Sequence, residues 1–340
     1  MPSPLRALIP ATFRAHRYAK YGAADQVLEL RSDVPQAPLS PTQVRVKVHS
    51  AAIDSIDVKL MAGYVPPFLK VFPTSEEPLG IGFDAAGTVV ETGSAVKDDG
   101  ALQVGDTLHL MTPFTAWGSF AEYLTVDHNF AARKPTALSF DQAAGLPLSG
   151  LTSYQALQQH AKFQKGERVL ILDGSSATGI FAIQIAKAVG AHVITTASTR
   201  NVEFVKSVGA DQVIDYSTTT WADVLPLHSI DVFYDCGIDA NVWNTDAQNV
   251  LWKETGRLVS RHPIAEPTVA SKYGAKLLGR IVVQPSGAQL SELARLVDDG
   301  KIVTPIDLVH RLENVLDAVA RVASRHATGK IVIQVAPEAQ

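Results

Sequence analysis

A short run of glycine and hydroxyl residues is the part of the sequence whose residue types and spacing most directly indicate chemistry. Gly174-x-Ser176-x-x-Gly179 follows the apolar stretch 168–172, which is typical of a buried strand. It departs from the pattern G-x-G-x-x-G only in its middle residue. A corner of this kind binds the pyrophosphate of a dinucleotide, because unpaired N–H groups at the start of the following helix point at the phosphate. We therefore expect a phosphate-binding turn here.

The residues of this corner have separate expected roles. Gly174 makes the tight turn, and Gly179 lets the helix pack closely on the strand. The Cβ of Ser176 keeps the backbone slightly farther from the phosphate, and the hydroxyls of Ser175, Ser176 and Thr178 are expected to bridge that gap. The alternative is an ordinary strand–turn–helix connection, since an imperfect glycine pattern is a weak signal. The helical periodicity after the turn and the strand that follows it favour the dinucleotide site.

The residues after that second strand indicate which dinucleotide binds. They are Ser198, Thr199, Arg200 and Asn201. A site for the cofactor without a 2′-phosphate carries Asp or Glu here, and this chain has no acid between residues 173 and 203. Hydroxyl and amide groups donate to phosphate oxygens, and arginine pairs with them. The sequence therefore predicts NADPH; the alternative is that these four residues only cap the next helix.

Composition narrows the class of protein. The chain has 340 residues, 46% hydrophobic and 19% charged, with a net charge of −4 and no long basic run. We expect a well-buried globular protein that binds neither nucleic acid nor membrane. The single cysteine, Cys236, excludes an intramolecular disulfide and suits a reducing compartment, so we expect a cytoplasmic location.

The pattern of elements changes along the chain and predicts two domains. Residues 12–135 alternate as short strands between Gly- and Pro-containing turns, after an N-terminal extension. Residues 168–261 alternate strand and helix, which is typical of a parallel sheet covered on both faces. The tail after about residue 285 is expected to return to the first domain. We place the first domain at 1–133 with the return 286–340, and the second at 134–285.

Several stretches together resemble one family. They are 50–57 (SAAIDSID), 80–87 (GIGFDAAG), 104–106 (VGD), 118–123 (GSFAEY) and 329–333 (GKIVI). In their order and spacing the chain resembles the zinc-independent medium-chain dehydrogenase/reductases, the quinone oxidoreductase-like proteins. The resemblance implies an α/β fold: a Rossmann doubly wound parallel sheet plus a GroES-like β-rich catalytic domain built from both chain ends. It also implies a homodimer or homotetramer.

The same resemblance argues against a metal. Zinc-dependent relatives place a cysteine where this chain has Asp54, a histidine–glutamate pair at Phe83-Asp84, and a second cysteine near Leu148. Only two carboxylates remain, and catalytic zinc needs three protein ligands. We therefore expect no metal site.

Without a Lewis acid the hydride acceptor must already be activated, as a quinone or an α,β-unsaturated carbonyl is. Candidate catalytic residues are Asp54, Lys59 and Tyr64. Asp54 replaces the asparagine usual in the family, and a carboxylate donates to an oxyanion only when protonated. Lys59 is expected to stabilise negative charge or to reach the cofactor, and Tyr64 to stack on a flat acceptor or to donate its hydroxyl. The alternative for all three is a polar loop without a chemical role.

Further cofactor contacts come from positions that match the family. Thr152 matches a residue that contacts the nicotinamide carboxamide, although it could instead cap a helix. Tyr216 matches a residue that packs beside the 2′-phosphate. Cys236 is expected near the cofactor as packing, and Gly329 and Lys330 are assigned to cofactor binding.

These observations predict an NADPH-dependent oxidoreductase that transfers hydride to quinones without a metal. An enoyl reductase acting on α,β-unsaturated carbonyls uses the same hydride step and remains open. A protein of another class, which binds NADPH or senses redox state without turnover, is the third possibility.

Overall fold

The computed structural model describes residues 9–65, 69, 71–100, 102–116 and 118–336, so the first part of the expected N-terminal extension lies outside it. The chain divides into two compact units. The first unit comprises residues 1–148, 285–298 and 304–340, and the second comprises 149–284 and 299–303. The division differs from the boundary expected at 133/134. Residues 134–148 lie in the first unit because helix α4 (Phe140–Ala144) packs on its sheet.

Two sheets form the first unit. The smaller sheet has the order β2-β1-β4, and the larger has the order β15-β16-β3-β5-β6-β8 with β7 paired to β3. These strands are β1 Thr12–Tyr18, β2 Glu29–Pro35, β3 Gln43–Ile53, β4 Leu79–Gly80, β5 Asp84–Thr92, β6 Thr107–Met111, β7 Tyr123–Asp127, β8 Ala131–Arg133, β15 Ile306–Arg311 and β16 Lys330–Gln334. The C-terminal residues therefore return to this unit, where β16 runs antiparallel to β3 with Ile331 opposite Ile53.

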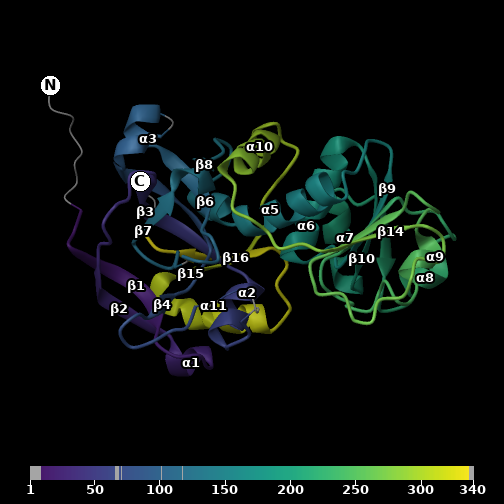
Figure 1. The fold of residues 1–340 in the computed structure, drawn as a ribbon, viewed down its shortest axis with the longest axis horizontal. Helices are drawn as coiled ribbons and strands as arrows, with labels where there is room; N and C mark the ends of the chain where they lie inside the picture. The colour runs from purple at the N-terminus through teal and green to yellow at the C-terminus, as the bar shows by residue number, and fades with distance from the viewer. Residues whose placement is uncertain (1–8, 66–68, 70, 101, 117, 337–340) are drawn as a thin grey trace. The chain divides into compact units, whose positions relative to one another are not determined.

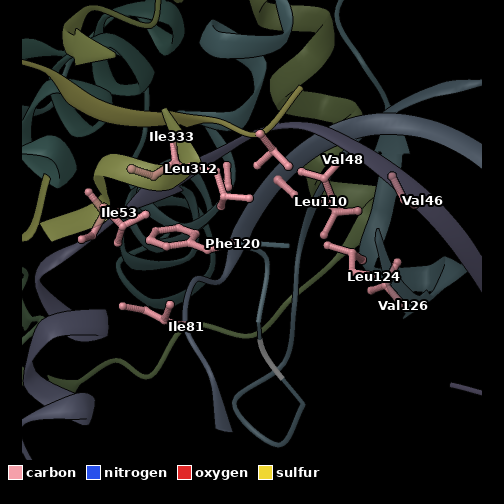
Figure 2. Packing of buried hydrophobic residues seen from close by; sticks show 14 of the residues in the cluster. Val46, Val48, Ile53, Ile81, Leu110, Phe120, Leu124, Val126, Leu312 and Ile333 are labelled. Atoms are coloured by element: carbon pink, nitrogen blue, oxygen red, sulfur yellow. The ribbon is translucent and has the colours of Figure 1, made fainter. Parts of the chain in front are cut away.

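The helices of the first unit are short. They are α1 Ala24–Val27, α2 Ser55–Met61, α3 Ser94–Asp99, η1 His128–Phe130, α4, α10 Gly287–Asp298, η4 Leu312–Asn314 and α11 Val315–Ala323. The core is aliphatic and alternates along the strands, as a half-buried sheet requires. Figure 2 shows side chains of β3, β6 and β7 packing with Phe120, Leu312 and Ile333, so both ends of the chain build one core.

The second unit is a parallel sheet of six strands in the order β11-β10-β9-β12-β13-β14. Figure 1 labels β9, β10 and β14 of this sheet. Its strands are β9 Arg168–Leu172, β10 His192–Ala197, β11 Gln212–Asp215, β12 Val232–Asp235, β13 Arg257–Ser260 and β14 Lys276–Arg280. The helices are α6 Ala177–Val189, η3 Thr199–Asn201, α7 Val202–Ser207, α8 Trp221–Val224 and α9 Ala247–Val250. The parallel sheet confirms the predicted Rossmann class.

The boundary between the two units falls within α5 (Pro147–Tyr154), which continues as the π-helix η2 (Gln155–His160). Ser153, in α5, donates from its hydroxyl to the carbonyl of Thr178 at 2.7 Å, which ties this helix to the first turn of α6. No helix of the described residues is long and apolar enough to cross a membrane.

Candidate functional site

The glycine corner has the geometry that its sequence predicts. Ser176 caps α6: its hydroxyl accepts from the Gly179 N–H at 3.1 Å and donates to the Asp173 carbonyl at 2.8 Å. A Cβ on Gly179 would lie 2.2 Å from the Asp173 carbonyl oxygen, and one on Gly174 would lie 2.1 Å from the Thr195 hydroxyl oxygen. Both positions therefore require glycine. The turn leads into a 13-residue helix, and the N-terminus of a helix favours an anion.

The serine and threonine hydroxyls of the corner differ in their surroundings. Ser175 is 8% exposed, and its hydroxyl accepts from the Asn201 side-chain amide at 3.0 Å. Thr178 is equally buried, in the first turn of α6. Asn201 thus supports the turn from the end of the neighbouring strand, in addition to any contact with a ligand.

Residues 198–201 follow β10 as predicted, but their hydrogen bonds add a residue that the sequence reasoning missed. The Thr199 hydroxyl donates to the Asp215 carboxylate at 2.6 Å, and this bond holds the pKa of Asp215 below its usual range. The Arg200 guanidinium is exposed and pairs with none of the described residues. Ser198 and Asn201 stand at the N-cap positions of η3 and α7, but neither side chain makes a capping hydrogen bond. Asp215 ends the neighbouring strand β11, and only strand adjacency brings it to Thr199.

The other residues assigned to the cofactor lie in different settings. Tyr216, after β11, is 59% exposed, while Cys236, after β12, is 1% exposed and burial raises the pKa of its thiol. Structural cysteines are typically buried and protonated in this way. Thr152 lies inside α5, which rules out a capping role. Gly329 has a φ of +116°, and a Cβ there would meet the Pro305 carbonyl, so the turn before β16 requires this glycine.

Lys330 was assigned to cofactor binding, but the structure places it in a buried cluster of carboxylates in the first unit. Its ammonium lies 2.7 Å from each Asp54 carboxylate oxygen and 3.5 Å from Asp84 Oδ2. The Lys330 side chain is 2% exposed and that of Asp84 is 0% exposed. We call Lys330, Asp54, Asp57 and Asp84 the lysine–aspartate cluster. It joins residues 276 positions apart, a pairing that spacing along the chain does not reveal.

Backbone groups fix the carboxylates of this cluster. Asp57 accepts from the N–H of Asp54 at 2.7 Å and from the N–H of Gly82 at 3.1 Å. Asp84 Oδ1 accepts from the Leu148 N–H at 2.8 Å. Asp54 precedes α2, so its backbone is held where β3 turns into that helix. The side chain of Asp54, 10% exposed, is the most accessible in the cluster.

Electrostatics divide the cluster into groups of different proton affinity. Burial, with the charge of Asp54 second, raises the pKa of Asp57 to about 8. Burial also raises the pKa of Asp84 well above its usual range, against the opposing effect of Lys330. Burial acts to lower the pKa of Lys330, but the charges of Asp54 and Asp84 outweigh it, and the pKa is raised. The cluster therefore holds a charged ammonium and exchangeable protons near neutral pH.

The two other predicted catalytic residues follow Asp54 on and after α2. Lys59 is half-buried in the last turn of α2, and its carbonyl accepts from the Tyr64 N–H at 2.9 Å. Tyr64 is 66% exposed. Lys59 and Tyr64 therefore lie close to Asp54 along the chain, and the Tyr64 ring does not pack in the core.

The donor set of the cluster does not suit zinc. A lysine ammonium lies between the two carboxylates that stand where zinc-dependent relatives place ligands. Among the described residues no three His, Cys, Asp or Glu side chains are grouped so as to hold a metal ion. Zinc requires deprotonated N, S or O donors, and the ammonium offers none.

The chain matches two known protein families. Residues 40–136 match the alcohol dehydrogenase GroES-like domain, and residues 208–333 match a family described as zinc-binding dehydrogenase. The name of the second family does not describe the donors found here, since the lysine–aspartate cluster lacks a zinc ligand set.

Individual proteins are similar over nearly the whole chain. The NADPH-dependent alkenal/one oxidoreductase of Arabidopsis thaliana is 34% identical over 97% of this chain and 82% of its own length. The quinone-oxidoreductase homolog of Spinacia oleracea is 32% identical over 94% of this chain and 98% of its own. The solved structure of the quinone oxidoreductase from Coxiella burnetii has a TM-score of 0.81 at 30% identity, covering 95% of this chain and 99% of that one.

Proposed function

This chain belongs to the medium-chain dehydrogenase/reductase family, among its quinone oxidoreductase-like members, and from that premise we propose that it transfers hydride from NADPH to quinones. The observation that carries the proposal is the glycine corner, whose two glycines leave no room for a side chain beside the start of α6. A turn built in this way binds the pyrophosphate of a dinucleotide.

We assign the residues of the second unit to holding the cofactor. The N–H groups at the start of α6, with the hydroxyls of Ser175 and Thr178, bind the pyrophosphate. Arg200, exposed and without an ion-pair partner, pairs with the 2′-phosphate. Because the Thr199 hydroxyl donates to Asp215, it contributes less to binding the 2′-phosphate than its position suggests. When bound, the cofactor supplies a hydride from C4 of its dihydronicotinamide ring.

We assign proton supply to the lysine–aspartate cluster. Reduction of a quinone to a hydroquinone requires one hydride and one proton. Enone reduction requires one hydride and one proton as well. In both cases an oxyanion forms first and must be protonated. Asp54 is the most accessible carboxylate of the cluster, and Lys330 behind it carries a proton 2.7 Å away.

A second acceptor class has a specific observation in its favour. The Arabidopsis relative that is 34% identical is named for alkenals and enones. These acceptors resemble quinones in carrying a C=C bond conjugated to a carbonyl, so they need no Lewis acid to accept a hydride. We therefore propose NADPH-dependent reduction of α,β-unsaturated carbonyls as the alternative activity.

The test is NADPH oxidation by the purified protein against a panel of quinones, enones and saturated ketones. We expect turnover of a para-quinone, an enone or both, and none of cyclohexanone. The Gly179→Val variant, assayed beside it, controls for contaminating reductases. Equal turnover of cyclohexanone and the quinone would overturn the proposal. Cofactor binding without turnover of any acceptor would instead identify a non-catalytic NADPH-binding protein.

We also propose that the protein is zinc-independent, assembles as a homodimer or homotetramer, and acts in the cytoplasm on small molecules, without nucleic-acid or membrane partners. The relatives from Arabidopsis and spinach are named chloroplastic, so the compartment requires its own test. Light scattering during gel filtration gives the assembly, and a fluorescent fusion expressed in the source cells gives the location.

A further inference from the structure

Arg17 in the first unit is a cation that none of the described residues pairs with. It lies on β1, the central strand of the three-stranded sheet, and its guanidinium makes no hydrogen bond or ion pair with any described residue. Burial, and then the nearby Arg31, lower its pKa, although a guanidinium remains charged at any physiological pH. Arg17 is half-buried and none of the described residues compensates its charge, so the guanidinium is open to a counter-charge from solvent or from a ligand.

The carboxylates near Arg17 do not supply that charge. Glu29 lies opposite Arg17 in the strand register, yet forms no ion pair with it. Asp33 is engaged by Arg31 through two hydrogen bonds of 3.0 and 2.9 Å. Glu76 is exposed and pairs with neither arginine. The positive charge of Arg17 therefore remains available to a ligand.

Arg17 and Arg31 both line a pocket of about 530 Å³. Its other walls include the apolar side chains Val34, Val71 and Leu79. Gly118 leaves room for the guanidinium, since a Cβ there would lie 2.9 Å from Arg17 Nη1. The pocket is the size of a small-molecule site, and its walls combine apolar side chains with three charged ones, Arg17, Arg31 and Glu76, a mixture that can give both affinity and specificity.

We propose that this pocket binds an organic anion, a carboxylate on an apolar body, with the carboxylate on Arg17. A carboxylate matches the planar fork of a guanidinium. The apolar walls and the volume favour a molecule larger than an inorganic ion. None of the residues that line the pocket belongs to the lysine–aspartate cluster or to the glycine corner, so the site is additional to the proposed hydride transfer and does not depend on it.

The test is titration calorimetry of the full chain in saturating NADPH, which keeps added anions out of the dinucleotide site. The probes are 4-phenylbutyrate, its uncharged counterpart 4-phenylbutanol, and inorganic phosphate. We expect 4-phenylbutyrate to bind and the other two to bind at least tenfold more weakly. Arg17→Gln should weaken 4-phenylbutyrate about ten- to a hundredfold, the usual loss of a charged hydrogen-bond partner.

Two further variants keep the test decisive. Arg133→Gln removes a surface ion pair with Asp106, outside the pocket, and should leave binding unchanged. Glu76→Gln removes a competing negative charge from the pocket wall and should strengthen binding, which gives a result even if Arg17→Gln fails to fold. Equal binding of the alcohol, tighter binding of phosphate, no binding of the acid, or unchanged binding by folded Arg17→Gln would each overturn the proposal.

Discussion

Replacement of Lys330 by methionine tests the lysine–aspartate cluster directly. Methionine keeps most of the volume of the side chain but removes the ammonium that lies 2.7 Å from Asp54 and 3.5 Å from Asp84. Removing one partner of a buried ion pair typically costs about 3–5 kcal/mol, because the remaining charge stays buried and unpaired. Since Lys330 is 2% exposed, we expect a loss in that range for the first unit at pH 8.

The size of the loss should depend on pH. Without the ammonium, the carboxylates of the cluster bind protons more readily, so lowering the pH neutralises them and reduces the penalty. Urea unfolding of wild type and Lys330→Met at pH 8 and pH 5, followed by amide signals of the first unit, measures both effects. The double variant Asp54→Leu/Lys330→Met removes the pair together and should recover much of the stability. A loss below about 1 kcal/mol that does not change with pH would refute the reasoning, because it matches an exposed ion pair.

The remaining predictions concern the corner, the 2′-phosphate, the metal and the pH dependence. Gly179→Val should abolish NADPH binding while the sheet still folds, because a side chain there meets the Asp173 carbonyl at 2.2 Å; unchanged affinity in fluorescence titration would remove the corner from the site. Arg200→Ala should weaken the binding of NADPH about tenfold and leave the binding of NADH unchanged. Tenfold is at the low end for a charged pair because the Arg200 side chain is exposed. Equal wild-type affinity for both cofactors would contradict the assignment. Prolonged chelation should change neither quinone turnover nor melting temperature, and loss of both on removal of stoichiometric zinc would show that the protein holds a metal. In the folded protein the pKa of Asp57 is about 8, above its ordinary 3.8. The stability that this raised pKa contributes is therefore fully present below pH 3.8 and is lost as the pH rises through 8. Urea midpoints from pH 4 to 9 should fall accordingly, and less steeply in Asp57→Asn.

The corner was predictable because its physics is local. Gly174, Ser176 and Gly179 are close in sequence, and each contact that fixes their roles lies within one turn or one neighbouring strand. The alternation of strand and helix likewise predicted the parallel sheet, since each strand is a short apolar run between helices.

The cluster was not predictable in the same way. Lys330 reads as part of a terminal strand, and nothing near it in sequence indicates Asp54 as its partner. Their contact depends on β16 pairing with β3, which the hydrophobic pattern does not specify. The contact between Thr199 and Asp215 was unpredictable for the same reason. The sequence between residues 173 and 203 lacks an acid, but the neighbouring strand places the Asp215 carboxylate beside Thr199.

The return of the C-terminal strand has a consequence for synthesis on the ribosome. Until β16 emerges, the Ser50–Ile53 edge of β3 lacks its partner, and Asp54 and Asp84 lack their ammonium. Translation from residue 148 to residue 334 lasts on the order of 10 to 40 s at about 5–20 residues per second. Throughout that interval the nascent first unit presents an open strand edge, the kind of surface that chaperones cover and that pairs wrongly with other chains. The second unit, continuous apart from five residues, can fold while the first one waits.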